Sequence, residues 1–464
     1  MIEFGKSLVI QETSIPGLLI LDLPVHGDSR GWFKENWQRE KMVTAGLPDL
    51  GPVQNNISFN DEVGTTRGIH AEPWDKYVSV ATGKIFGAWV DLREGKSFGK
   101  VFTAQIDPSK AVFVPRGVGN SYQTLEEDTA YTYLVNDHWS ATADYTFLNL
   151  ADEASAIQWP IPLENALLSD KDKAHPRLEQ VVPMKPKKTL VIGSNGQLGI
   201  ALRKEFPEAD FASRQEFDIA DPHAFKDFPW HQYSTVINAT AFTSVDEAET
   251  IEGRRSAWRT NVTGLSHLVQ TCLDQGLLLV HVSSDYVFDG TKTTPYTEED
   301  EVSPLGVYAQ TKAAGEELVS VLPQHYIVRT SWAIGEGKNF VRTMVSLADK
   351  GINPSVVNDQ IGRLTFTVDL AQAIGHLLRT RPSCGLYNFS NEGPQSSWAE
   401  IASRVFQLTG HDLTRVTGVS THQFFEGKPG VAPRPLWSML DLSKIEATGF
   451  TPANWEDRLQ EYLA

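Results

Sequence analysis

Short apolar runs follow one another through the first third of the chain, and Gly, Pro, Asp and Asn separate them. This region extends from Ile2 to about Pro162 and contains the runs LLILDL, YVSVATG, IFGAWVDL, VFTAQI, AVFVP and TAYTYLV. Runs of this length with turn residues between them are typical of short strands. The pattern therefore predicts an antiparallel barrel or jelly roll.

A different pattern begins after VVPMKPKK, the stretch from Val181 to Lys188, whose prolines and lysines interrupt the apolar runs. Beyond it, β-rich runs such as TLVIGS, TVINAT, LLLVHVSS and YIVRT are each followed by a segment with helical spacing. This alternation indicates a parallel sheet covered by helices. We therefore expect an all-β domain over residues 1–182, a linker at 183–187 and an α/β domain over 188–464.

Length and composition fit this division. The 464 residues are enough for two or three independent cores. The chain is 41% apolar and 21% charged, as globular proteins are, and no apolar run approaches the roughly 20 residues of a membrane helix. The first residues lack the basic start and single apolar block of a secretory signal, so we expect a cytoplasmic protein.

Charge and cysteine usage exclude several classes of partner and site. The net charge of −17 argues against nucleic acid or an anionic membrane, because both would repel the protein at long range. An anionic small substrate would need local Arg and Lys side chains. Cys272 and Cys384 are the only cysteines, and both fall in segments that are predicted to be core. This argues against a disulfide framework or a Cys-based zinc site, and no metal ligand is predicted.

A glycine-rich turn, from Gly193 to Gly199 with the sequence GSNGQLG, joins the run TLVIGS to a helical segment. Glycines at this spacing let backbone amides at a helix N-terminus approach the pyrophosphate of a dinucleotide, although tight strand-to-helix turns also use glycine without a ligand. Near the end of the expected second strand, Asp218 is placed to meet the adenosine half and Arg214 a 2′-phosphate. The alternative for Arg214 is ordinary surface charge.

Three side chains point to carbonyl reduction. Ser284 ends the run LLLVHVSS, and Tyr308 and Lys312 are four residues apart, which places them on one face of a helix. A hydride that reaches a carbonyl carbon leaves negative charge on the oxygen. Tyr308 can protonate that oxygen, Lys312 can make the phenol more acidic, and Ser284 can hold the oxygen. The alternative is a surface helix that carries the Tyr and Lys by chance.

The motifs GSNGQLG, VINATAFTSVDEAE, VSSDYVFDG, SPLGVYAQTK, RTSW and VNDQIGR, in this order, closely resemble those of the dTDP-4-dehydrorhamnose reductases over Lys188 to Ala464. The resemblance implies a Rossmann fold of the extended short-chain dehydrogenase/reductase type with a small C-terminal substrate lobe. It also implies reduction of the C4 ketone of a dTDP-linked 4-keto sugar by NADPH or NADH. One departure is Ser284, where relatives usually carry Thr, but the hydroxyl is kept.

By this resemblance, Tyr286, Trp332 and Arg434 contact the sugar nucleotide, and Arg434 offers a bidentate partner for phosphate. Core aromatics and one surface arginine are the alternative. The implied cofactor-binding residues are Gly193, Gly196, Gln197, Leu198, Gly199, Arg214, Asp218, Ile219, Ala239, Ala241, Tyr308 and Lys312.

The strand-rich region brings two arginines, a histidine and several amides together in the segments DSRGWFKE, QNNIS and RGIH. Arg30 and Arg67 suit a diphosphate. Removal and replacement of a proton next to a ketone needs a base, an electrophile, an acid and an orienting carboxylate. Candidates for these roles, in that order, are His70, Lys76, Tyr133 and Asp172. On spacing alone, a histidine near a strand end is more often structural.

The motifs D-x-R-G-x-F-x-E, Q-x-N-x-S, R-G-I-H, K-Y-V, V-D-L-R, P-R-G, Y-L-V-N-D, W-P and L-S-D-K-D resemble, in this order, those of the dTDP-4-dehydrorhamnose 3,5-epimerases from Ile2 to about Lys173. The resemblance implies a cupin-type jelly roll and a homodimer through this domain. It implies that His70 abstracts protons at C5 and C3, that Asp172 holds its imidazole, that Lys76 stabilises the enolate oxygen, and that Tyr133 protonates the opposite face. The implied substrate-binding residues are Arg30, Glu35, Gln54, Asn56 and Arg67.

Three features depart from the epimerase pattern. Asn120 replaces a histidine, Glu72 replaces a glutamine after the catalytic histidine, and the loop from His70 to Lys76 is shortened. These departures bear on the substrate range. None of the four proton-transfer groups is missing, which favours an active epimerase.

The two resemblances name consecutive steps. Our hypothesis is therefore one chain that epimerises dTDP-4-dehydro-6-deoxy-D-glucose and reduces the product to dTDP-L-rhamnose, with tethering raising the local concentration of the intermediate. One alternative is a reductase whose jelly roll only binds ligand or drives dimerisation. A second is a non-catalytic nucleotide-binding regulatory subunit, against which the intact Ser284, Tyr308 and Lys312 argue.

Overall fold

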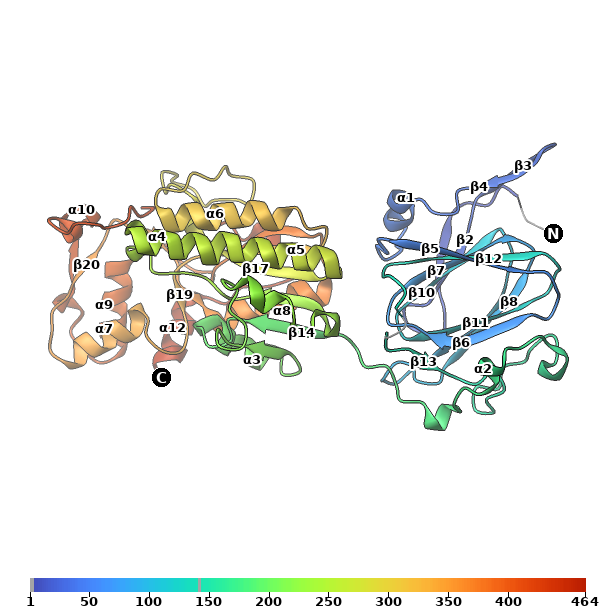
Figure 1. Ribbon diagram of the computed structural model, residues 1–464. Coiled ribbons are helices and arrows are strands. Elements are labelled where there is room, and N and C mark those ends of the chain that lie inside the picture. The colour runs from blue at the N-terminus through green and yellow to red at the C-terminus, as the bar shows by residue number, and fades with distance from the viewer. Residues whose placement is uncertain (1–3, 141–142) are drawn as a thin grey trace. The chain divides into compact units, whose positions relative to one another are not determined.

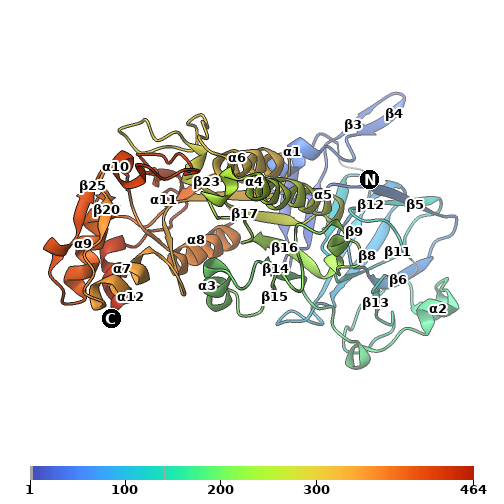
Figure 2. The ribbon, with the colours of Figure 1, turned by 60° about the vertical axis from the view of Figure 1, so that its left-hand side comes forward.

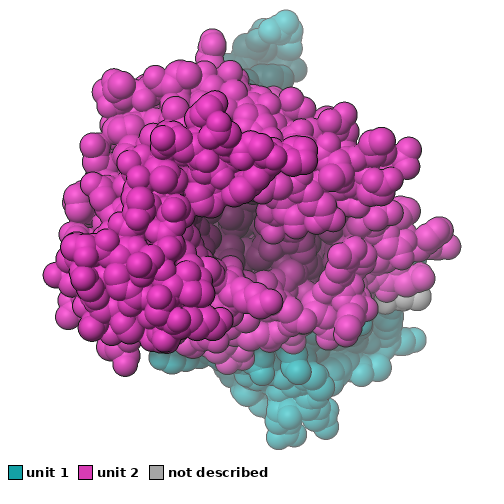
Figure 3. All heavy atoms as spheres, turned by 90° about the vertical axis from the view of Figure 1, so that its left-hand side faces the viewer, with its two compact units in different colours: residues 1–186 teal, residues 187–464 magenta. Residues whose placement is uncertain are grey.

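The computed structural model describes residues 4–140 and 143–464, so Ile2, the expected start of the strand-rich region, lies outside the described residues. The fold divides after Pro186 into two compact units, the N-terminal unit and the C-terminal unit (Lys187–Ala464), which Figure 3 colours separately. Within the expected linker at 183–187, Met184 is 6% exposed and forms an isolated β-bridge with Arg93. The chain is therefore held against the N-terminal unit as far as Met184.

Two antiparallel sheets make up the N-terminal unit and confirm the predicted jelly roll (Figure 1). Their strand orders are β1-β2-β10-β7-β12-β5 and β13-β6-β11-β8-β9. The first sheet contains β1 (Val9–Glu12), β2 (Leu19–Asp22), β5 (Gln54–Asn60), β7 (Lys76–Thr82), β10 (Lys110–Val114) and β12 (Thr129–Val135). The second contains β6 (Thr66–Ala71), β8 (Ile85–Asp91), β9 (Val101–Ile106), β11 (Val118–Thr124) and β13 (Thr146–Phe147).

Strand β7 shows how the sequence fixes this arrangement. Alternate residues of a strand face opposite sides, so Val78 and Val80 enter the core between the sheets and pack with Trp89 of β8. Tyr77 faces the other way and packs with Met42 of α1 (Arg39–Thr44). Because both faces of β7 are buried, a slip of one residue would exchange its two sets of neighbours, and the register is strongly specified.

Two further elements of the N-terminal unit bear on the site. Strands β3 (Val25–Asp28) and β4 (Gly31–Lys34) form a separate hairpin that extends beyond the two sheets (Figures 1 and 2). Helix α2 (Asp170–Lys173) begins at Ser169, whose side chain accepts a hydrogen bond from the backbone of Asp172. This cap fixes a short helix in a region of few regular elements.

The C-terminal unit is built on a parallel sheet with the strand order β15-β14-β16-β17-β18-β23, which confirms the predicted Rossmann-type fold. Helices α4, α5 and α6 cover one face of the sheet, and α3 and α8 cover the other (Figure 2). The strands are β14 (Lys188–Ile192), β15 (Asp210–Ala212), β16 (Tyr233–Asn238), β17 (Leu278–Ser284), β18 (His325–Thr330) and β23 (Gly385–Phe389). The helices are α3 (Gln197–Glu205), α4 (Ile251–Trp258), α5 (Leu265–Gln275), α6 (Val307–Ser320) and α8 (Thr367–Thr380).

The strand order reverses at β14, which has β15 on one side and β16 on the other. In open parallel sheets, the connections from two such neighbours leave in opposite directions and open a crevice beyond the carboxyl ends of the strands. Both faces of β14 are buried, because Leu190 and Ile192 pack with α5 while Val191 packs with α3 and α8. The glycine turn follows directly after this buried strand.

A small lobe with its own core, as the resemblance implies, is built from segments before and after β23, the last strand of the sheet. Ile334, Met344 and Phe406 are among its buried residues. Its helices are α7 (Phe340–Asp349), α9 (Trp398–Leu408), α10 (Thr421–Phe425) and α12 (Trp455–Leu463), whereas α11 (Ser443–Glu446) packs with the core of the parallel sheet through Ile445. Its short strands are β19 (Ala333–Ile334), β20 (Ser355–Val357), β21 (Ile361–Gly362), β22 (Thr365–Phe366), β24 (Ser396–Ser397) and β25 (Thr417–Val419).

The expectation that both cysteines are core residues is wrong for one of them. Cys272 of α5 is buried, but Cys384 is exposed. Cys384 lies in the short connection from α8 to β23, next to Gly385, the first residue of that strand. Within residues 4–140 and 143–464, no helix combines the length and the apolar character needed to cross a membrane.

Candidate functional site

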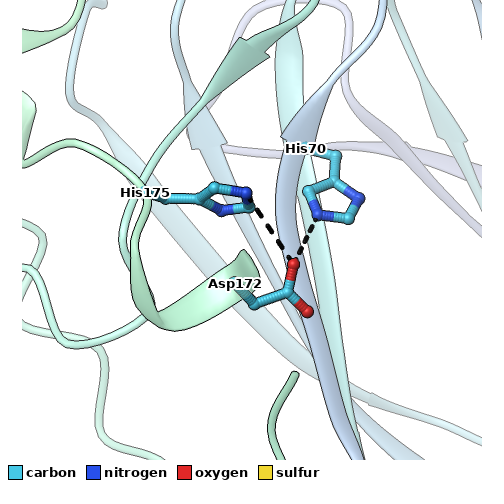
Figure 4. Close-up of side chains that lie close together, drawn as sticks. All are labelled: His70, Asp172 and His175. Carbon is cyan, nitrogen blue, oxygen red and sulfur yellow. Dashed lines mark hydrogen bonds and ion pairs between the residues drawn. The ribbon is translucent and has the colours of Figure 1, made fainter. Parts of the chain in front are cut away.

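A carboxylate holds His70 in the N-terminal unit. His70 lies on β6, and its Nε2 is 2.9 Å from Oδ1 of Asp172 in α2. Nε2 of His175 lies 3.8 Å from the same oxygen (Figure 4). Burial opposes ionisation of Asp172, but the hydrogen bond and charge of His70 hold the pKa of the carboxyl below its usual range. The ionised carboxylate therefore orients the imidazole, and Nδ1 is the nitrogen of His70 that can face a substrate.

Phe147 of β13 packs against both imidazoles. Its ring meets His70 edge-on at a centroid distance of 5.5 Å and stacks on His175 at 4.7 Å. Burial first, and the charge of His70 after it, lower the pKa of His175, so this ring is neutral near pH 7. Ligand-type atoms of His70, Asp172 and His175 lie within 4.8 Å of one another, a set that can bind a transition metal. As it stands, the carboxylate oxygen is already hydrogen-bonded to His70.

Lys76 and Tyr133 form a second group in this unit. Lys76, the first residue of β7, is buried, and its ammonium contacts the carboxylate of Glu72. The same ammonium lies 5.0 Å from the ring centroid of Tyr133 on β12. Burial, and after it the charge of Glu72, raise the pKa of Tyr133 and keep the phenol protonated. A protonated phenol can donate a proton, and a lysine beside it can hold an oxyanion.

The two groups come from different sheets, since β6 belongs to the five-stranded sheet and β7 and β12 to the six-stranded one. Tyr145 connects them. Its ring stacks with Phe147 at a centroid distance of 5.7 Å. Its pKa is raised to about 12 by burial, with Glu72 and Tyr133 adding to the effect, so Tyr145 also lies close to the second group.

The two residues that depart from the epimerase pattern lie at this site, with Asn120 buried and Glu72 partly buried. Asn120 of β11 stands opposite His70 in the strand register. Its Oδ1 accepts from the indole of Trp89 at 2.9 Å, and its amide donates to the hydroxyl of Tyr131 at 2.9 Å. Asn120 therefore fixes two large rings of the site wall. Glu72, the second departure, is the ion-pair partner of Lys76.

Three of the predicted substrate-binding residues lie on the strands near Tyr133. Gln54 and Asn56 are on the less exposed face of β5, where the amide of Gln54 donates to Asn56 at 2.8 Å. Arg67 lies on β6, donates to the side chain of Asn60 at 3.3 Å and has an electrostatic effect on Tyr133.

The other two predicted residues lie elsewhere. Arg30 is exposed in the hairpin of β3 and β4 and forms a salt bridge with Asp28. Glu35 follows the hairpin and pairs with Lys41 at 2.6 Å. The structure thus places both of them on the projecting hairpin or beside it.

The C-terminal unit is hollowed on one face (Figure 3). A cavity of about 1060 Å³ lies at the carboxyl ends of the parallel strands, where Asn238, Ser284 and Thr330 end β16, β17 and β18. The glycine turn, Tyr308 and Lys312 line the same cavity. A volume of this size is at the upper end for a small-molecule site.

The glycines of the turn differ in their surroundings. Gly193 has φ +86°, and a Cβ there would lie 2.8 Å from the backbone of Ala239. A Cβ on Gly199 would lie 2.4 Å from the carbonyl oxygen of Gly193. A Cβ on Gly196 would meet only that oxygen, at 3.4 Å. The first and third glycines therefore form the turn itself, whereas Gly196 leaves open space at the N-terminus of α3.

The other predicted cofactor-binding residues are placed as follows. The Gln197 side chain accepts from the backbone of Gly335 at 2.7 Å, which ties the turn to the small lobe. Arg214 is exposed and lies 3.2 Å from Asp218. Ile219 is a buried core residue. Residues that line the cavity are Gly196, Gln197, Leu198, Ala239 and Ala241.

Ser284, Tyr308 and Lys312 meet at the cavity. Burial raises the pKa of Tyr308 to about 12, although a hydrogen bond with Ser284 opposes this. Burial lowers the pKa of Lys312 to about 8, with Glu316 acting against it. Nζ of Lys312 donates to the carbonyl of Val282 at 2.7 Å. The phenol is therefore protonated at neutral pH, and the lysine titrates about one pH unit above neutrality.

The residues predicted to contact the sugar nucleotide surround this group. Tyr286 meets Tyr308 edge-on at a centroid distance of 5.6 Å, and Trp332 lines the cavity. Nη2 of Arg434 lies 2.8 Å from both carboxylate oxygens of Asp246. The guanidinium is thus already paired.

Sequence reasoning missed four buried polar residues. Asn238 and His281 each sit inside an apolar strand run, TVINAT and LLLVHVSS, and a polar residue in such a run was the signal available. Burial raises the pKa of Asp285, next to Ser284, to about 6. His175 follows α2 directly, two residues after its last residue Lys173, and no sequence pattern singled it out.

Comparison with known proteins places each unit in a family. Residues 187–464 match the family described as RmlD substrate binding domain, and residues 12–180 match dTDP-4-dehydrorhamnose 3,5-epimerase. A protein named Protein RmlC homolog from Streptococcus pyogenes serotype M6 is 53% identical over 192 residues, which is 40% of this chain and 96% of that protein.

Two relatives match the C-terminal unit. The dTDP-4-dehydrorhamnose reductase of Aggregatibacter actinomycetemcomitans is 36% identical over 302 residues, covering 59% of this chain and 98% of that protein. The crystal structure of dTDP-4-dehydrorhamnose reductase from Bacillus anthracis in complex with NADP is 32% identical, with a TM-score of 0.55 and coverage of 60% of this chain and 98% of that one. The chain is therefore the fusion that the motifs predict, and it belongs to the RmlD family through its C-terminal unit and to the dTDP-4-dehydrorhamnose 3,5-epimerase family through its N-terminal unit.

Proposed function

We propose that the chain converts a dTDP-linked 4-keto-6-deoxy sugar in two steps: epimerisation at C3 and C5 by the N-terminal unit, then reduction of the C4 ketone by the C-terminal unit with NADPH. With dTDP-4-dehydro-6-deoxy-D-glucose as substrate, the product is dTDP-L-rhamnose. One observation carries the proposal: a single chain holds both a histidine bound to an ionised carboxylate and a Tyr–Lys pair beside a glycine turn. The families of the two units support it.

The epimerase step uses the acidity of protons next to a ketone. In this proposal His70 removes such a proton, and Asp172 orients the imidazole and stabilises its charged form. The Lys76 ammonium holds the enolate oxygen that results. Tyr133, which its raised pKa keeps protonated, returns a proton to the opposite face. Arg67, Gln54 and Asn56 bind the nucleotide part in this proposal, together with Arg30 and Glu35.

The reduction step needs an acid and an oxyanion site. Tyr308 protonates the former ketone oxygen, and the Ser284 hydroxyl holds that oxygen while charge develops. Lys312, when charged, lowers the pKa of the phenol. Tyr286, Trp332 and Arg434 line the sugar-nucleotide side, where Arg434 must exchange its carboxylate partner Asp246 for phosphate.

NADPH fits the residues of the C-terminal cavity. The open space at Gly196 would receive the pyrophosphate at the N-terminus of α3. Arg214, released from Asp218, would pair with the 2′-phosphate, and Ala239 and Ala241 would line the cofactor. When bound, the cofactor supplies the hydride. The NADP complex of the 32% identical Bacillus anthracis reductase supports this choice.

We also propose that the chain works in the cytoplasm as a homodimer formed through the N-terminal unit. Phe33 of β4 and Ile57 and Phe59 of β5 are exposed large apolar side chains, and a dimer that covers them would remove this surface from water. Sedimentation of the full chain and of an Ile57→Lys variant tests the dimer. A monomeric wild-type chain would contradict it.

The central experiment supplies the purified chain with dTDP-4-dehydro-6-deoxy-D-glucose in D2O, followed by NMR and by NADPH absorbance. We expect deuterium at C3 and C5 before NADPH is added, and oxidation of NADPH afterwards. Absence of substrate-dependent NADPH oxidation would contradict the reductase. Absence of deuterium exchange with reduction intact would instead support a jelly roll that only binds ligand or drives dimerisation.

A further inference from the structure

A row of buried polar side chains connects the central sheet to Lys312. Asn238 of β16 stands beside His281 of β17 in the parallel register. Nδ2 of Asn238 lies 3.1 Å from Nδ1 of His281, and Nε2 of His281 lies 3.3 Å from Nζ of Lys312. Each of the three side chains belongs to a residue that is at most 2% exposed. Their protons and lone pairs must therefore be matched within the protein.

Thr240 fixes the orientation of the Asn238 amide. The backbone N–H and the hydroxyl of Thr240 lie 3.0 and 2.6 Å from Oδ1 of Asn238. A backbone N–H can only donate, so the atom that faces Thr240 is the carbonyl oxygen, and the NH2 group faces His281. Nδ1 of His281 must therefore accept a hydrogen bond.

The position of the remaining imidazole proton follows. Complete burial lowers the pKa of His281 well below its usual value, so the ring is neutral. A neutral imidazole whose Nδ1 accepts carries its single proton on Nε2. That N–H is directed at Nζ of Lys312, and a hydrogen bond between them requires a lone pair on Nζ. An ammonium at this place would oppose one N–H group to another.

We propose that Asn238 and His281 are positioning residues that favour the neutral amine form of Lys312 over the ammonium in the C-terminal unit. The amine then accepts from His281 and donates to the carbonyl of Val282. The functional part of this inference, a role in reduction, rests on the reductase activity proposed above. Its structural part, the tautomer of His281 and the charge of Lys312, does not depend on that activity.

The groups around Lys312 are consistent with a neutral amine. On its own helix, Glu316 is the nearest carboxylate in sequence, but Arg329 of β18 pairs with it, with contacts of 2.7 and 3.0 Å. Tyr308, also on α6, is protonated, and Asp285 after β17 acts on Tyr308. From β17 the group that faces Nζ is the neutral His281. Lys312 thus faces no unpaired carboxylate among these groups.

The reaction gives this arrangement a role. Reduction of a ketone by NADPH consumes one proton, which ends on the new hydroxyl group. Tyr308 gives up its proton to the oxygen, and the tyrosinate must regain one before the next cycle. A neutral Lys312 takes that proton from water and passes it to Tyr308 as an ammonium. The pair Asn238–His281 would therefore set the alkaline limit of reduction, where Lys312 no longer binds the proton.

Two spectra of the full-length wild-type chain test the structural part. In a two-bond 1H–15N spectrum of histidine-labelled protein, assigned with His281→Gln, we expect His281 to be protonated on Nε2 alone. A ring protonated on Nδ1, or on both nitrogens, overturns the proposal. In a 13C spectrum of labelled lysine, we expect Lys312 to titrate near pH 8. An ordinary lysine pKa of about 10.4 also overturns it. Neither result depends on turnover.

A variant tests the functional part. In Asn238→Asp the carboxylate can only accept, so the imidazole proton should move to Nδ1 and Nε2 should accept from a charged Lys312. We expect the alkaline limit of kcat/KM for reduction to rise by about one pH unit or more. Val280→Ala alters the opposite face of the same strand and should lower stability without moving this limit. If the imidazole proton of His281 moves to Nδ1 but the alkaline limit of kcat/KM stays where it is, the link to Lys312 is overturned. If the wild-type chain does not reduce the sugar at all, only the proposed function is contradicted.

Discussion

Nε2 of His70 lies 2.9 Å from Oδ1 of Asp172, although the two residues are 102 positions apart in the chain. The contact joins a strand of the five-stranded sheet to the short helix α2 that follows the jelly roll. Because the pKa of Asp172 is lowered, the carboxylate stays charged beside the imidazole throughout the neutral range. An imidazole that is oriented on one nitrogen and accessible on the other is suited to act as a base.

Asp172→Asn should remove most of the epimerase activity without unfolding the jelly roll. The amide keeps the size of the side chain but loses the charge that stabilises imidazolium, so we expect deuterium exchange at C3 and C5 to fall by about 100-fold or more. His70→Ala should remove exchange entirely. NMR in D2O measures the exchange. Both variants should still oxidise NADPH when they are given the epimerised sugar, and a loss of both activities would point to general damage instead.

Tyr308→Phe should remove reduction and leave epimerisation intact, whereas Asp172→Asn should do the reverse. Without the phenol, no acid stands beside the ketone oxygen, and we expect kcat for reduction to fall by about 100-fold to 10,000-fold. NADPH absorbance measures the rate. Deuterium exchange in the N-terminal unit should be unchanged, because Tyr308 lies in the other unit. Undiminished reduction would remove the basis for the reductase site.

Much of the fold could be predicted from local pattern. The runs around Val78 and Val191 indicate their strands directly, because a strand buried on both faces is rich in apolar residues. The carboxylate partner of His70 was available only through resemblance, since no local pattern joins positions 102 apart. Asn238, His281 and His175 were missed for a related reason. The role of each residue depends on the polar atom that its side chain faces, and only the tertiary packing determines which atom that is.

The two unlike glycines of the turn allow a matched test of cofactor binding. Gly193→Ala should destabilise the C-terminal unit, because φ is +86° there and a Cβ would lie 2.8 Å from the backbone of Ala239. Gly196→Ala should leave the melting temperature nearly unchanged, because a Cβ fits there. It should still weaken NADPH binding, since the methyl group would occupy the space over the N-terminus of α3. Calorimetry measures both quantities. Equal NADPH affinity in Gly196→Ala and wild type would contradict the placement of the pyrophosphate.

Asp285→Asn should stabilise the C-terminal unit at neutral pH. Burial, against hydrogen bonds from Ser438 and Ser284, raises the pKa of Asp285 from 3.8 to about 6. The folded state thus binds this proton more tightly than the unfolded chain does, so the free energy of unfolding falls as pH rises from about 4 to about 6 and stays low above that. The shift corresponds to about 3 kcal/mol at most.

Scanning calorimetry of the full chain at pH 5 and pH 8 checks this prediction, using the transition that NADPH stabilises. We expect the gain of Asp285→Asn to be full at pH 8 and about half as large at pH 5, where the folded wild type already holds most of the proton. Asp227→Asn is the matched control, because Asp227 is exposed in the same unit and has no buried charge to relieve. A gain that does not change with pH would mean that the charge of Asp285 is not its cause. A loss of stability at pH 8 would mean that the hydrogen bonds of this carboxylate outweigh the cost of burying its charge.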